Sequence, residues 1–197
     1  MKKILITLFV SMLTCILSGQ SSCFEEFDIV DSIYYLNGTI FSGKFTCHDD
    51  NGVLRRQGHI VNGKLDGVTE FYGRNGILQE SILYRENHPV VRTFYRKNSN
   101  PAYKQSMLKG IEHGVWEKYY MNGKIKERLY FDNGKPIDIC SQWDKKGRVS
   151  METDYTKDTI VTKYHDYRFG RHKVLVRYIN STTMKTISKE KMVCIEN

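Results

Sequence analysis

Few residues of the chain combine the types and spacing that catalysis needs. The GxSxG, HExxH and P-loop patterns do not occur in the sequence. His48-Asp49-Asp50 offers metal-ligand atoms, but these residues fall where a solvated turn is expected, which is the simpler interpretation. His165-Asp166 stands at the expected end of a strand, where an exposed pair is favoured over a site. The sequence therefore predicts no metal site and no cofactor.

The region around residue 140 gives equally little support for a nucleophilic site. Ser141 has Asp138 and Asp144 nearby, but the sequence suggests no triad with a histidine. Cys140 could act as a nucleophile only as a reduced thiol, which an oxidising compartment disfavours. We therefore expect a protein without catalytic residues rather than an enzyme.

Aromatic side chains are better candidates for a binding role. The sequence contains 13 Tyr and 2 Trp, residues that offer a large contact area with a polar tip at low entropic cost. Tyr72, Tyr95 and Tyr120 recur at about the same place in successive segments, and alternation puts Trp116 on the face expected for Tyr120. These residues could contact a protein or a sugar. The alternative is that they pack against one another across strands, at roughly 0.2–1 kcal/mol per pair.

The N-terminus has the pattern of a secretory signal peptide. Met1-Lys2-Lys3 is a short positive region, and residues 4–17 form an uncharged apolar run. This run is shorter than the roughly 18 or more residues of a spanning helix, so a retained anchor is the less favoured alternative. We expect cleavage between Gly19 and Gln20. The mature protein is then exported to the periplasm, the cell envelope or the extracellular space.

Four cysteines remain after cleavage and are disulfide candidates in an oxidising compartment: Cys23, Cys47, Cys140 and Cys194. Four cysteines allow three pairings, and the sequence does not choose between them. The alternative is that some of them are small buried apolar residues. Lipidation of Cys23 is a further alternative, which Gln20 disfavours because a branched or Leu residue is expected three positions before a lipidated cysteine.

The chain is basic. Its formal net charge is +8, and removal of residues 1–19 takes away Lys2 and Lys3 but no acid, which leaves +6. In an exported protein this balance favours anionic lipid or glycan as a partner, whereas nucleic acid is not expected outside the cytoplasm. Because the basic residues are spread along the chain, an ordinary solvated surface is the alternative.

Turn-forming residues recur at a spacing of about 24 residues. One series of turns comprises Asn51-Gly52, Asn75-Gly76, Asn98-Ser99-Asn100, Asn122-Gly123 and Lys146-Gly147. A second, interleaved series comprises Asn37-Gly38, Asn62-Gly63, Asn87-His88, Glu112-His113 and Asn133-Gly134. A two-residue turn of type I′ needs positive φ at both central residues, which Asn tolerates and Gly adopts freely. We therefore expect type I′ hairpins at the Asn-Gly dipeptides.

The segments between these turns have the composition of strands. Residues 69–72 and 115–121 are rich in β-branched and aromatic residues, which fit a pleated, half-buried surface. No segment has a cleanly apolar face, which favours a thin twisted sheet over a sandwich. Glycines before the strands suggest bulges at Gly43, Gly67 and Gly114. The expected fold class is all-β: an elongated single-layer antiparallel sheet of repeated β-hairpins.

The repeat unit resembles a known family. "NGKLDGVTEFYGRNGILQESILY" (residues 62–84) and "GIEHGVWEKYYMNGKIKERLYF" (residues 110–131) are similar to the MORN-repeat variant, found in bacterial proteins that are often labelled antitoxin-like, of the YwqK type. The resemblance covers about residues 34–148. It is degraded in the third copy, where Pro89 and Pro101 are expected in widened loops. It implies a binding or scaffold module rather than an enzyme.

The sequence thus predicts four regions. They are a signal peptide (1–19), a lead-in (20–33), MORN-like hairpin repeats (34–148) and a C-terminal β cap (149–197). The last region could also continue the sheet with a lost repeat signal. We expect an exported, non-catalytic protein-interaction or scaffold module, with an antitoxin-like or immunity role as one form. The alternative is an envelope module that binds anionic lipid or glycan through aromatic rows and basic charge.

Overall fold

The computed structural model describes residues 27–168, 171–188 and 191–195, the last range by its backbone only. Antiparallel strands make up nearly all of the regular structure in these residues, so the expected all-β hairpin fold is confirmed. Packing divides the chain after His88. We call residues 27–88 the N-terminal unit and the residues from Pro89 onward the C-terminal unit, and we describe each by itself.

The N-terminal unit contains two antiparallel sheets. The smaller has the order β1-β2-β3, with β1 (Asp28–Val30), β2 (Ile33–Leu36) and β3 (Thr39–Ile40). The larger contains β4 (Gly43–His48), β5 (Leu54–Val61), β7 (Gly67–Tyr72) and β8 (Leu78–Arg85), paired in that order, with the short β6 (Lys64–Leu65) also on β5.

A compact apolar cluster holds this unit together. Alternation along β4 turns Phe45 and Cys47 inward, where they meet Ile60 and Leu65. Four further aromatic residues pack against this cluster, three of them from the segment that carries the small sheet: Phe27, Tyr34, Phe41 and Tyr84. Sequence-distant backbone bonds fix that segment, because the Tyr34 amide donates to the Gly63 carbonyl over 2.9 Å.

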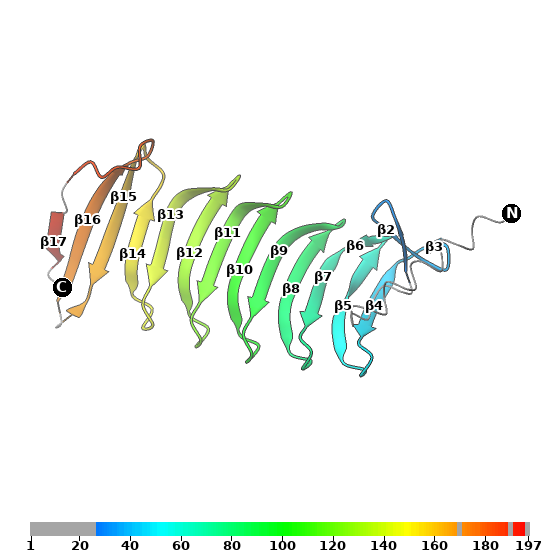
Figure 1. The fold of residues 1–197 in the computed structure, drawn as a ribbon. Coiled ribbons are helices and arrows are strands. Elements are labelled where there is room, and N and C mark those ends of the chain that lie inside the picture. The colour runs from blue at the N-terminus through cyan, green and yellow to red at the C-terminus, as the bar shows by residue number, and fades with distance from the viewer. Residues whose placement is uncertain (1–26, 169–170, 189–190, 196–197) are drawn as a thin grey trace. The chain divides into compact units, whose positions relative to one another are not determined.

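The C-terminal unit is one antiparallel sheet in which each strand pairs with the next along the chain (Figure 1). Its strands are β9 (His88–Tyr95), β10 (Pro101–Leu108), β11 (Ile111–Tyr119), β12 (Ile125–Asp132), β13 (Lys135–Trp143), β14 (Val149–Asp154), β15 (Thr159–Asp166), β16 (His172–Asn180) and β17 (Lys191–Ile195). Since β14 pairs with β13, residues from 149 onward continue the sheet, which is one of the two alternatives left open by the sequence.

Burial is sparse in the C-terminal unit. Its buried side chains, among the described residues, are Cys140, Thr153, Ile160, Thr162 and Val174. Most others are half-buried, and aromatic pairs such as Phe94 and Tyr103, stacked at 4.4 Å between ring centroids, replace a deep core. This agrees with a thin sheet whose stability rests on cross-strand pairs.

The two series of turns use different backbone chemistry and lie at opposite ends of the strands in the C-terminal unit (Figure 1). In the second series both central residues have positive φ, as type I′ requires, at 37–38, 62–63, 86–87, 109–110 and 133–134. The prediction is confirmed at Asn37, Asn62 and Asn133. It is wrong by one residue at Asn87-His88 and by three at Glu112-His113, because the chain turns at Lys109-Gly110 instead.

The first series consists of three-residue loops, so the type I′ prediction is wrong there. Only one loop residue has positive φ in each, as Gly123 does at +80°. The Gly123 amide donates to the Tyr120 carbonyl, and the Tyr120 amide donates to the Lys124 carbonyl. This is a type I turn closed by a left-handed residue. The Asn122 side chain accepts from the Lys124 amide over 3.1 Å, which explains Asn without positive φ.

The glycines and prolines singled out in the sequence were predicted to mark bulges and widened loops, and the structure confirms only some of these predictions. Gly114, with φ of +85°, lies where the pairing of β10 with β11 shifts register, which confirms the expected bulge. Gly67, with φ of +90°, starts β7 after Asp66 interrupts the pairing with β5. The prolines do not widen loops: Pro89 lies within β9 and Pro101 is the first residue of β10, a position where the missing N–H is tolerated.

Candidate functional site

The loop geometry corrects the alignment of the predicted aromatic row. The last strand residue before each three-residue loop, two positions ahead of the loop itself, is Tyr72, Tyr95, Tyr119 or Trp143 in successive repeats. Tyr120 is therefore one position later than Tyr72 and Tyr95 and is not their equivalent. Counting back four residues from the left-handed loop residue gives the correct alignment, and this signal was available in the sequence.

Tyr119 belongs to a three-residue contact with Glu117 and Arg128. The Tyr119 hydroxyl donates to Glu117 Oε2 over 2.5 Å, and Arg128 donates through Nε and Nη2 to Glu117 Oε1 over 2.8 and 2.7 Å. Burial opposes the charge on Glu117, but the bond from Tyr119 and the ion pair with Arg128 outweigh it and lower the Glu117 pKa. Burial and the neighbouring carboxylate raise the pKa of Tyr119 to about 12.

The same arrangement occurs around Tyr72 in the N-terminal unit. Its hydroxyl donates to Glu70 Oε2 over 2.8 Å, and Gln57 Nε2 lies 2.7 Å from the hydroxyl and 2.5 Å from the same carboxylate oxygen. Burial, with Glu70 beside it, raises the Tyr72 pKa. The hydroxyls of Tyr72 and Tyr119 are thus both hydrogen-bonded to carboxylates of the protein itself.

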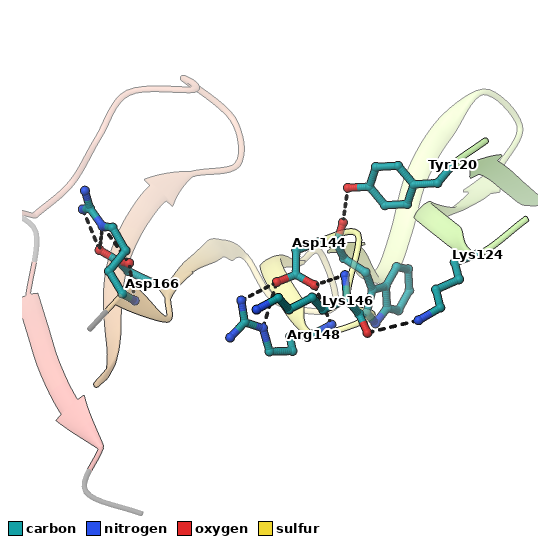
Figure 2. A network of polar contacts seen from close by, with 8 residues as sticks. Tyr120, Lys124, Asp144, Lys146, Arg148 and Asp166 are labelled. Carbon is teal, nitrogen blue, oxygen red and sulfur yellow. Dashed lines mark hydrogen bonds and ion pairs between the residues drawn. The ribbon is translucent and has the colours of Figure 1, made fainter. Parts of the chain in front are cut away.

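Tyr120 links neighbouring loops. Figure 2 shows its hydroxyl reaching the next loop, where it donates to the Trp143 carbonyl over 2.7 Å. Arg96, which has the same position in the preceding loop, donates to the Tyr119 carbonyl over 2.5 Å. Lys124 adds a bond to the Lys146 carbonyl over 3.4 Å. The Tyr120 hydroxyl therefore connects neighbouring repeats by a hydrogen bond to the backbone.

Trp116 lies on the opposite face of β11 from Glu117. Its ring is 5.7 Å from that of Phe131, and Lys118 Nζ lies 5.0 Å from the centroid. The indole Nε1 is buried without a hydrogen-bond partner. Tyr95 is half-buried at the end of β9. Trp116 and Tyr120 have different partners, Phe131 and Lys118 for the first and the Trp143 carbonyl for the second.

An aliphatic surface on the Glu117 face was missed by the sequence analysis. We call it the aliphatic patch, and it consists of Leu108, Ile111, Val115, Ile137 and Ile139 from β10, β11 and β13. Each side chain is 36–51% exposed. Strand register places them on one face: Leu108 pairs with Ile111, and Tyr130 pairs with both Val115 and Ile137. For Val115 and Ile139 the available signal was a β-branched residue four positions before the aromatic residue that ends the strand.

The cysteines divide into different environments. Cys47 is buried in the apolar cluster of the N-terminal unit. Cys140 is buried and forms no disulfide with a described side chain. Its thiol donates to the Ile137 carbonyl over 3.7 Å. Burial raises the pKa of this thiol. Cys140 is thus not a disulfide partner of any described side chain. Cys23 and the side chain of Cys194 lie outside the described residues, so disulfides involving them stay predictions.

The described residues contain no group of three side chains suited to a metal ion. In the acidic stretch after His48, the Asp49 side chain stabilises a turn. It accepts hydrogen bonds from the backbone amides of Asn51 and Val53, both over 3.0 Å. This is the solvated turn that the sequence favoured. No helix long and apolar enough to span a membrane is found in the described part of the chain.

Fold and surface define a repeat protein of antiparallel hairpins with a water-facing aliphatic patch. A comparison with protein families matches residues 112–133, from β11 to the turn after β12, to the MORN repeat variant. MORN repeats are non-enzymatic and generally mediate binding to proteins or membrane lipids. A search of curated proteins finds no match for the chain.

Proposed function

We propose that the protein is an exported, non-catalytic interaction module that binds an apolar segment of a partner protein on the aliphatic patch. The observation that carries the proposal is the exposure of five aliphatic side chains on one face of β10, β11 and β13. Contiguous exposed apolar surface on a soluble protein commonly marks an interaction site. The MORN repeat match at residues 112–133 covers part of this surface and supports a binding role.

The polar surroundings of the patch favour a protein partner. Glu117 and Arg128 neutralise each other on the same face, and Tyr119 holds them in place. Such a paired, oriented border resembles the polar rim around the apolar centre of a protein interface. The aromatic residues predicted from the sequence serve mainly packing in this proposal, because the hydroxyls of Tyr72 and Tyr120 are already bonded. An antitoxin-like or immunity role is one form that this binding could take.

A second candidate function is binding to anionic lipid or glycan. It is favoured by an open hollow of about 480 Å³ between the ends of β15 and β16, lined by Asp166, Arg168, Arg171 and Lys173. Asp166 pairs with Arg168 there, over 2.7 Å (Figure 2). Two of the basic side chains lining the hollow, Arg171 and Lys173, lie outside this pair and would face an anionic surface.

The experiment is capture of partners by the tagged full-length protein from its native envelope after crosslinking, read by mass spectrometry. Substitution of Ile111 and Ile139 by Glu should abolish capture of the partner, because buried charge is costly in an apolar interface. Val68→Glu is the matched control: Val68 is 51% exposed in the equivalent strand position of the N-terminal unit. It should leave capture and thermal unfolding unchanged.

The same sample tests export and the second candidate. The intact mass of the purified protein should correspond to a chain that starts at Gln20, and retention of Met1 would contradict export. Capture that persists in the Ile111 and Ile139 variant would overturn the patch as the binding site. Salt-sensitive binding to vesicles of anionic lipid, retained in that variant, would support the second function.

A further inference from the structure

Two histidines join the ends of β15 and β16. His165 Nδ1 and His172 Nε2 lie 3.0 Å apart, with ring centroids 5.2 Å apart and ring planes inclined by 20°. Since the distance between the centroids nearly equals the nitrogen distance plus the two ring radii, the rings meet edge to edge. Their nitrogens therefore point at each other as in a hydrogen bond. We call these residues the histidine pair.

The histidine pair has close neighbours on β14 and on its own strands, although His165 Nε2 itself makes no hydrogen bond. Glu152 Oε2 of β14 lies 3.6 Å from His165 Nε2. The Tyr167 ring stacks on His172 with centroids 4.4 Å apart and planes inclined by 12°, and Arg148 lies 4.4 Å from the centroid of Tyr167. The pair thus connects three neighbouring strands at one end of the sheet.

Among the described side chains, charged groups near the pair come from β14, from β15 and β16, and from the residues beside these strands. Glu152 is the acidic neighbour from β14, and Arg148 precedes that strand. Lys163 on β15 acts electrostatically on His165. On β16, Lys173 lies opposite Asp166 in the strand register. The Asp166 carboxylate forms its ion pair with Arg168. On β17, which is described by its backbone only, strand register places Val193 opposite Val174 and Ile195 opposite His172.

The number of protons on the two rings determines whether the hydrogen bond between them can form. The bond needs one nitrogen with a hydrogen and one without, so it is satisfied when both rings are neutral or when they share one extra proton. A second extra proton would put N–H against N–H and two positive charges in contact. Imidazole gains its proton near pH 6.5, within a range that an exported protein can encounter.

We propose that the histidine pair is an acid-sensitive latch between β15 and β16, closed at neutral pH and opened when both rings become protonated. Opening separates the ends of the two strands and frees the Tyr167 ring from its stack on His172. Because Arg168, Arg171 and Lys173 border the same strand ends, the basic hollow changes shape with it. The latch is independent of whether the aliphatic patch binds a protein.

The lowered pKa of His165 also predicts that acid destabilises the folded arrangement of the pair. Burial lowers its pKa, and His172 lowers it further, whereas Glu152 acts in the opposite sense. A histidine whose pKa is lowered by folding binds fewer protons in the folded than in the unfolded state. Its contribution to stability is therefore complete above about pH 6.5 and is lost progressively as the pH falls toward the lower folded value.

Hydrogen exchange of the full protein, compared at about pH 7.5 and about pH 5 and corrected for intrinsic rates, tests the latch. Peptides from β15 and β16 should lose about tenfold in protection at the lower pH, while those from β11 and β12 keep theirs. His172→Gln places an amide near the position of Nε2 but does not titrate, so it should remove the pH dependence. His59→Gln, an exposed histidine of β5, should retain it.

Protection of β15 and β16 that is equal at the two pH values would overturn the latch, as would an undiminished pH effect in His172→Gln. Should that variant fail to fold, the wild-type imidazole signals in NMR decide. A coupled pair should titrate in two separated steps. Two independent titrations at the ordinary value for histidine would contradict the proposal.

Discussion

At the residue scale, Glu117 makes the densest set of polar contacts on the face that carries the aliphatic patch. Its carboxylate, 13% exposed, accepts from Tyr119 on its own strand and from Arg128 on β12. Such charge-assisted, partly buried bonds are stronger than surface ion pairs. Glu70 repeats the arrangement with Tyr72 and Gln57. In both repeats a carboxylate two positions before the tyrosine that ends the strand thus accepts a hydrogen bond from the hydroxyl of that tyrosine.

Replacing Glu117 by Gln should lower the free energy of unfolding by about 1–3 kcal/mol at neutral pH, because two donors lose a charged acceptor. The Glu117 pKa is lowered by folding, so its contribution is present above about pH 4.3 and is lost as the pH falls through the folded value. Urea denaturation at neutral and acidic pH measures both effects. The control is Glu86→Gln, whose 73%-exposed side chain pairs with Lys64 and should cost about 0–1 kcal/mol. Equal costs for the two variants would contradict this account.

At the element scale, two kinds of turn alternate along the hairpins. The type I′ turns need two left-handed residues, whereas each three-residue loop needs one, with the remaining bonds supplied by Asn or Asp side chains. The loops are also tied to one another, as Tyr120 is to Trp143. Each loop therefore fixes both the register of its own hairpin and the contact with the next.

Gly38 and Gly63 both adopt positive φ in type I′ turns, but only Gly63 is crowded by a neighbouring side chain. Replacing each by Ala therefore distinguishes the cost of the backbone conformation from the cost of the steric clash. Gly38 has φ of +75° with open space around it, whereas a Cβ on Gly63, with φ of +73°, would lie 2.4 Å from Ile33 Cγ2. Gly38→Ala should cost about 1–2 kcal/mol for the left-handed conformation alone. Gly63→Ala should cost clearly more, because Ile33 of the small sheet must also move. Thermal unfolding of both variants measures the difference, and equal melting temperatures would show that the small sheet yields without cost.

At the scale of the whole molecule, the two units are stabilised differently. The N-terminal unit has an apolar cluster under a small sheet. The C-terminal unit relies on cross-strand pairs, and three of its five buried side chains among the described residues are Cys140, Thr153 and Thr162. Repeat sheets of this kind derive their stability mainly from neighbouring strands, so cooperativity between distant strands is weak.

We therefore expect the units to unfold at different urea concentrations. Both tryptophans of the chain, Trp116 and Trp143, lie in the C-terminal unit, so their fluorescence reports on that unit alone. The fluorescence midpoint should fall below the midpoint of the far-ultraviolet circular dichroism signal, which reports on both units. Coincident transitions would instead indicate a single cooperative unit.

The periodicity of the hairpins was determined by the sequence because turn chemistry is local. Asn and Gly fix backbone handedness within a few residues, so hairpins in residues 34–148 could be predicted before any contact was known. For residues 149–197, where the turn signal fades, a cap and a continuation of the sheet both stayed open. The prediction failed for Glu112-His113 because it followed the spacing of the other turns, whereas the bulge in β11 moves the turn three residues earlier, to Lys109-Gly110. Export, too, was inferred from the first residues alone and stays a prediction.

Only the tertiary structure decided which side chains meet. The bond from Tyr120 to the Trp143 carbonyl, the pairing of Glu117 with Arg128, and the contact of His165 with His172 all depend on strand register. A bulge or a one-residue shift in a turn moves a side chain to the other face of the sheet. Local propensity does not fix such shifts, because they are set by the summed packing of neighbouring strands. For that reason the gathering of the five aliphatic side chains on one face became visible only in the folded chain.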